Sequence, residues 1–241
     1  MDRYGERQAA ASSDSEHHDV DSQPPFRIKI CGITRSEDID VAVAAGADAI
    51  GLNFYAGSKR YVTESQATRL RDYAGDRIGV IGVWVNEEVD RIRAETDRLG
   101  LDAIQLHGDE PAAALQALAS YRVIKAIRHP FTPDAEALMS QAFAGEQGLA
   151  GVLIDAARPG QYGGTGTPVA WASLKPERQR IPPGAMLLAG GLTPDTVQEA
   201  VLTAIPDGVD VASGVETLPG HKDAELVRAF VAAVHEVAPW R

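Results

Sequence analysis

The single cysteine of this 241-residue chain lies where an apolar segment meets a glycine. Cys31 follows "RIKI" and precedes Gly32, and a glycine lets a ligand approach the backbone closely. A thiol with an ordinary pKa of about 8.5 can accept a proton or act as a nucleophile once its anion is stabilised. Two other interpretations of Cys31 are open: it fills space in the core, or it pairs with His107 of "QLHGDE".

Asp155 ends another apolar segment, "GVLID". An apolar setting raises the pKa of a carboxyl group and suits it to general acid catalysis, whereas a strand exit can equally hold a surface aspartate. The segment that follows, "ARPGQYGGTGTPVAW", is rich in glycine. We expect it either to close over a substrate or to serve only as a crossover.

Two glycine-containing pairs follow the last two apolar segments. Gly190-Gly191 comes after "MLLA", and Ser213-Gly214 comes after "GVDVA". Backbone N–H groups in such turns bind phosphate, although glycine also serves simple turns. Two pairs in these places predict a phosphate site.

The elements that must position these residues alternate regularly. Apolar segments indicate eight strands, and periodic segments between them indicate helices, for example over 36–45, 87–99, 109–119 and 223–236. This alternation predicts a (β/α)8 TIM barrel, in which active sites form at the C-terminal ends of the strands. The expected strands are 27–32, 49–54, 78–85, 103–107, 122–127, 151–155, 185–190 and 208–213.

Local signals support the helix boundaries. The similar segments "GADAI", "GLDAI" and "GVDVA" place Gly46, Gly100 and Gly208 where we expect a helix to stop. Ser36 and Thr63, the latter with Gln66 three residues on, are expected helix starts. Pro111 and Pro194 are expected in first turns of helices.

Composition limits the class of function. With 44% hydrophobic residues the chain can bury a core, and its net charge of -11 disfavours nucleic acid and anionic membranes as partners. A lone cysteine suits a reducing, cytoplasmic setting. We expect a disordered acidic tail over 1–25 and a single barrel domain over 26–241, without predicting an oligomeric state.

The motifs "KICGITRSEDIDVAVAAGADAIGLNF", "QLHGDE", "VIKAI", "LAGGLTPD" and "GVDVASGVETLPGHKD" closely resemble the phosphoribosylanthranilate isomerase family of tryptophan biosynthesis. The resemblance runs from about Arg27 to Val237 and implies a (β/α)8 barrel with no metal and no organic cofactor. It implies an Amadori rearrangement of N-(5-phosphoribosyl)anthranilate to 1-(2-carboxyphenylamino)-1-deoxyribulose 5-phosphate.

The same resemblance assigns roles to residues. Cys31 would be the general base, Asp155 the general acid, and Arg60 the partner of the anthranilate carboxylate. Asp210 would line the substrate pocket; Gln105 and His107 are substrate-binding candidates for a different reason, their place at the end of the fourth expected strand. The backbone around Gly190, Gly191, Ser213 and Gly214 would hold the phosphate. The chain departs from the family in "SKR" near Arg60, where many members have S-P-R, and in "GTGTPVAW".

Alternative functions belong to several classes. A histidine-pathway barrel isomerase performs the same rearrangement with aspartates as base and acid, so Cys31 argues against it; a bifunctional isomerase is a related hypothesis. A sugar-phosphate-binding barrel without turnover is a third. A redox role for Cys31 lacks a second cysteine to resolve an oxidised thiol.

Overall fold

Eight parallel strands close into a barrel in the computed structural model, which describes residues 24–144, 149–156 and 171–238. Each strand pairs with its neighbour in sequence, and β1 pairs with β8. The strands are β1 Ile28–Cys31, β2 Ala49–Asn53, β3 Gly79–Trp84, β4 Ala103–Leu106, β5 Val123–His129, β6 Gly151–Ala156, β7 Met186–Leu188 and β8 Gly208–Val211. The predicted (β/α)8 barrel is confirmed, with strand ends within two residues of the expected ones.

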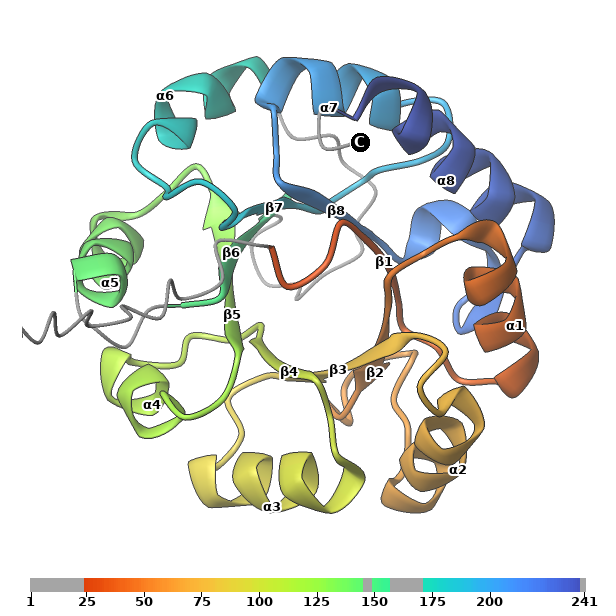
Figure 1. Ribbon diagram of the computed structural model, residues 1–241. Coiled ribbons are helices and arrows are strands. Elements are labelled where there is room, and N and C mark those ends of the chain that lie inside the picture. Colours follow the sequence, from red (N-terminus) through yellow and green to blue (C-terminus); the bar gives the residue numbers. More distant parts are fainter. Residues whose placement is uncertain (1–23, 145–148, 157–170, 239–241) are drawn as a thin grey trace, which may run out of the picture.

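Helices surround the ring of strands (Figure 1). They are α1 Ser36–Ala45, α2 Glu64–Ala74, α3 Val89–Leu99, α4 Ala112–Ala117, α5 Pro133–Ala144, α6 Lys175–Arg178, α7 Val197–Ala204 and α8 Ala224–Val237. Because strand side chains alternate between faces, each strand contributes to two cores. In β1, Ile28 and Ile30 pack outward against the helices, so Lys29 and Cys31 belong to the other face.

The inner core fills the barrel and begins at its N-terminal end. Phe26 packs there with apolar side chains from six strands, and Figure 1 shows this red segment within the ring. A Cβ at Gly208 would lie 2.4 Å from the Phe26 backbone oxygen. The expectation that Gly208 ends a helix is therefore wrong: it is the first residue of β8 and allows the N-terminal segment to approach.

Of the other predicted helix boundaries, three residues or pairs are confirmed and one is not. Gly46 and Gly100 end α1 and α3 in the left-handed conformation, as predicted. Thr63 and Gln66 form the predicted capping box of α2. Ser36 is the first residue of α1 but does not cap it, because the cap position is Arg35.

The two prolines predicted in first turns of helices have different outcomes. Pro111 lies immediately before α4, as expected to within one residue. The prediction for Pro194 is wrong, because α7 begins only at Val197 and residues 194–196 form a turn before it.

A small hairpin follows β8 at the end of the barrel where the site lies. Strand β9 Glu216–Leu218 pairs antiparallel with β10 His221–Lys222. The proposed tail over 1–25, apart from its last two residues, and the proposed lid after Asp155 lie outside the described residues. Within the described part of the chain, no helix is both long and apolar enough to span a membrane.

Candidate active site

A cavity opens at the C-terminal ends of the strands and gathers nearly all of the predicted site residues. Catalytic and binding residues are expected at this end in such barrels. The lining includes Cys31, Arg60, His107, Asp155, Gly190, Gly191, Asp210, Ser213 and Gly214, together with Asn53, Tyr55 and Ser58. Gln105 is different: it is fully buried beneath this surface and is not part of the lining.

Two glycines make room for Cys31 and its neighbours. Gly32 has φ +78, and a Cβ there would lie 2.3 Å from Cδ of Arg60, so glycine lets Arg60 cross beside the cysteine. A Cβ at Gly51 would lie 2.7 Å from Sγ of Cys31 and 3.1 Å from Cε of Lys29. The thiol and the Lys29 side chain therefore converge over Gly51.

Charges and burial act in opposite directions on the Cys31 thiol. Burial raises its pKa, and the Asp210 carboxylate raises it further. The ammonium groups of Lys29 and Lys222 lower it but do not cancel the increase. The pKa of the Cys31 thiol is thus above its ordinary value.

A buried lysine lies one inward-facing position before Cys31. Lys29 is 0% exposed, and its Nζ donates to Oε1 of Gln105 at 2.7 Å and to Oδ1 of Asp210 at 2.9 Å. Burial alone would lower the pKa of Lys29, but Asp210 and then Cys31 reverse the effect and raise it. Lys29 is therefore a cation under the cavity floor.

The hydrogen bonds continue from Lys29 to Asp155 and fix a histidine tautomer. An ammonium only donates, so Gln105 must present its oxygen to Lys29 and its amide N–H to His107. Nε2 of Gln105 lies 3.0 Å from Nδ1 of His107, which therefore accepts. The imidazole proton is then on Nε2, which donates to Oδ2 of Asp155 at 3.1 Å.

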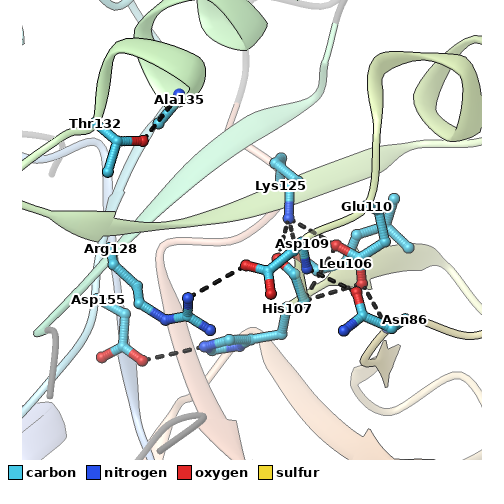
Figure 2. A network of polar contacts seen from close by, with 11 residues as sticks. Asn86, Leu106, His107, Asp109, Glu110, Lys125, Arg128, Thr132, Ala135 and Asp155 are labelled. Carbon is cyan, nitrogen blue, oxygen red and sulfur yellow. Dashed lines mark hydrogen bonds and ion pairs between the residues drawn. The ribbon is translucent and has the colours of Figure 1, made fainter. Parts of the chain in front are cut away.

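A second buried ion pair holds the loop that carries His107 (Figure 2). Nζ of Lys125 donates to Oε2 of Glu110 at 2.7 Å and to the backbone oxygen of Gly108 at 2.8 Å. Glu110 also accepts from the backbone N–H groups of Gly108 and Asn86. Burial lowers the pKa of Lys125, with Glu110 opposing the change.

Arg60 is held in place by an ion pair with Glu216 in the hairpin. Its Nε donates to Oε1 at 2.8 Å and its Nη2 donates to Oε2 at 2.5 Å. Oε1 of Glu216 also accepts from Nζ of Lys222, which in turn donates to the backbone oxygen of Cys31 at 2.6 Å. The hairpin thereby ties the arginine to the strand that carries the thiol.

The two predicted phosphate loops touch each other. Gly190 and Gly191 have φ of 86 and 69, a conformation that favours glycine. A Cβ at Gly214 would lie 1.9 Å from the backbone oxygen of Leu192, so the loop after β8 packs directly on the loop after β7. Both loops line the cavity. In barrels of this kind, the loops after the seventh and eighth strands often bind phosphate, and successive backbone N–H groups can bind an anion.

Sequence reasoning found many of the residues that line the cavity but missed Tyr55, Ser58 and the charged groups behind the lining. Lys29 carried a readable signal: it is a lysine two residues before Cys31 in an apolar strand, hence on the same face. Glu216 and Lys222 carried none, because their roles depend on the hairpin. The Cys31–His107 pairing is not what the geometry shows; His107 bonds to Asp155 instead.

Comparisons with known proteins identify the family of the chain. A family model described as N-(5'phosphoribosyl)anthranilate (PRA) isomerase matches residues 28–233. The N-(5'-phosphoribosyl)anthranilate isomerase of Myxococcus xanthus is 44% identical over 217 residues, covering 89% of this chain and 98% of its own. The corresponding protein of a Roseiflexus species is 43% identical over 220 residues, covering 88% and 99%.

Solved structures give the same answer. Phosphoribosyl anthranilate isomerase from Thermotoga maritima superposes with a TM-score of 0.74 at 34% identity, covering 88% of this chain and 99% of the other. A phosphoribosyl anthranilate isomerase in complex with reduced 1-(o-carboxyphenylamino)-1-deoxyribulose 5-phosphate gives 0.72 at 34% identity, with the same coverage. The chain belongs to the N-(5'-phosphoribosyl)anthranilate isomerase family.

Proposed function

We propose that this chain catalyses the Amadori rearrangement of N-(5-phosphoribosyl)anthranilate in tryptophan biosynthesis, with Cys31 as general base and Asp155 as general acid. The observation that carries the proposal is that Cys31 and Asp155, from strands on different sides of the barrel, line one cavity. The same cavity contains the two phosphate-type loops and Arg60, so it offers sites for both anionic ends of the substrate. The product is 1-(2-carboxyphenylamino)-1-deoxyribulose 5-phosphate.

The first step opens the ribose ring. Asp155 gives its proton to the ring oxygen as the C1′–O bond breaks, and the anilino nitrogen supplies the electron pair for an iminium group. The His107 N–H holds Oδ2 of Asp155, so Oδ1 is the atom that we assign to the proton transfer. General acid catalysis of this kind contributes roughly 10²–10⁴-fold.

The second step moves hydrogen from C2′ to C1′. The iminium acidifies the C2′ proton, Cys31 as thiolate removes it, and the electrons form a C1′=C2′ double bond. Cys31 then returns its proton to C1′ while the C2′ hydroxyl proton passes to Asp155 and the ketone forms. Both groups end the cycle in the state in which they began it.

The two ends of the substrate are anchored away from the reacting atoms. We assign the phosphate to the backbone of Gly190, Gly191, Ser213 and Gly214, and the anthranilate carboxylate to Arg60. Nη1 of Arg60 makes no hydrogen bond to a described residue, so it can point a donor at the carboxylate while Glu216 holds the rest. Anchoring at both ends turns remote binding energy into orientation of C1′ and C2′.

The test is a fluorescence assay of purified protein on freshly prepared phosphoribosylanthranilate, run in parallel with the histidine-pathway isomerase substrate. We expect turnover of the first substrate. Turnover of both would make the enzyme bifunctional, and tight binding of the product without turnover would make the chain a binding protein and overturn the proposal.

A further inference from the structure

A charged side chain without an assigned role lies under the reacting groups. Lys29 is fully buried in the barrel interior, and its Nζ is 5.4 Å from the ring centroid of Phe26. Burying an ammonium is costly unless it is paired and hydrogen-bonded. A neutral, apolar residue would fill this position in an ordinary barrel core, so the charge calls for a function.

We propose that Lys29 is a positioning residue for both reacting groups: its ammonium is the counter-ion of the Cys31 thiolate, and through Gln105 it sets the His107 tautomer that holds Asp155. An unbroken series of hydrogen bonds supports this proposal. Asp210, Lys29, Gln105, His107 and Asp155 form one chain of hydrogen bonds across the barrel, with distances between 2.7 and 3.1 Å.

The charge effect depends on every ionised group packed around Cys31. Lys29 comes from β1 itself, Asp210 from β8, Lys222 from the hairpin and Arg60 from the loop after β2. Asp210 opposes the thiolate, and Lys29 is the first of the cations that favour it. Lys29 also neutralises Asp210 directly, so its removal would expose the thiolate to an unbalanced carboxylate.

The tautomer effect follows from the direction of each hydrogen bond. If the ammonium were absent, Gln105 could turn its amide and offer oxygen to Nδ1 of His107, which would move the imidazole proton to Nδ1. Nε2 would then present a lone pair to the Asp155 carboxylate. Lys29 excludes this arrangement because an ammonium cannot face the amide NH₂ group.

The chain offers a direct readout, because its single cysteine makes alkylation specific for Cys31. We would measure the rate of iodoacetamide alkylation against pH in the wild type, Lys29→Met and Asp210→Asn. An opposite charge nearby lowers a thiol pKa by about 1–3 units, so Lys29→Met should move the titration toward alkaline pH by about one unit or more. Asp210→Asn, which keeps a hydrogen-bond acceptor for Lys29, should move it toward acid pH.

Lys125→Met is the matched control. It also removes a buried lysine from an ion pair, but Lys125 is not among the groups that act on Cys31. Its titration should match the wild type. An unchanged titration in folded Lys29→Met, or an equal shift in Lys125→Met, would overturn the counter-ion role. If Lys29→Met does not fold, Lys29→Gln, which also removes the cation, is titrated in its place and judged by the same two outcomes.

Nitrogen-15 NMR of His107 tests the second role without substrate. We expect the wild-type imidazole to be protonated at Nε2, and Lys29→Met to show protonation at Nδ1 as well. Protonation at Nδ1 in the wild type would refute this role. The inference depends on the proposed function only for its effect on turnover, since alkylation and NMR report on Lys29 even if the reaction differs.

Discussion

The two sides of the active-site cavity support their reacting groups in different ways. On the Cys31 side, four charged residues surround the thiol at close range: Lys29, Asp210, Lys222 and Arg60. On the Asp155 side, the carboxyl group meets a histidine whose tautomer is set by a neutral amide, while the ion pairs Lys125–Glu110 and Arg128–Asp109 join the loop after β4 to β5 beside it.

The difference fits the roles that we propose for the two groups. Nearby cations offset part of the cost of ionising a buried thiol, which accounts for its ionic surroundings. A carboxyl group that must gain and lose a proton needs orientation more than charge, so its partner is a hydrogen-bond donor. Burial is similar, since Cys31 is 9% exposed and Asp155 is 5% exposed, and chemistry accounts for the contrast.

Removing the proposed acid, Asp155, should change the activity most. Asp155→Asn keeps the shape and the contact with His107 but cannot supply a proton in the same way. We expect kcat to fall about 10²–10⁴-fold with little change in product affinity, measured by the fluorescence assay and by titration. A loss confined to KM would show that Asp155 binds substrate and does not donate the proton.

Neutralising one buried glutamate on each side tests whether the two ion pairs have separate roles. Glu216→Gln and Glu110→Gln are the same substitution at similar burial, since both side chains are at most 4% exposed. Breaking a buried ion pair costs about 3–5 kcal/mol, so both variants should lower the free energy of unfolding in urea. Only Glu216→Gln should also raise KM strongly, because it releases Arg60. A KM increase of equal size in Glu110→Gln would contradict the separate roles of the two sides.

The pH profile tests the assignment of Cys31 as the base. Burial, with Asp210 adding to it, raises the pKa of the Cys31 thiol, so the thiolate fraction grows as pH rises toward that value. Because Asp155 must carry its proton in the same reaction, the residual kcat/KM of Asp155→Asn isolates the thiol: below the thiol pKa it should increase about tenfold per pH unit, measured over buffers of constant ionic strength. A profile that falls over the same range would assign the base to another group.

The sequence predicts the frame of this molecule better than its interior. Alternating apolar and helical segments were enough for the barrel, because each pattern depends on local periodicity. Cys31, Asp155 and the glycine pairs could be found because the fold places strand ends at the site. The pairing of Lys29 with Asp210 joins residues 181 positions apart, and no local pattern encodes it.

The errors have the same origin. Gly208 looked like the helix-ending Gly46 and Gly100, yet its neighbour in space is Phe26 from the other end of the chain. Gln105 was expected in the substrate pocket, because it belongs to the "QLHGDE" motif at a strand end. The inward face of β4 instead buries it below the floor, where it joins Lys29 to His107.

The proposed removal of the C2′ proton by Cys31 is tested most directly by comparing Cys31→Ala with the wild type. The turnover of Cys31→Ala on freshly prepared phosphoribosylanthranilate would be measured beside its affinity for the product and its melting curve. We expect kcat to fall at least about 100-fold, with product affinity and melting unchanged. A Cys31→Ala protein that keeps most of the wild-type turnover would contradict it.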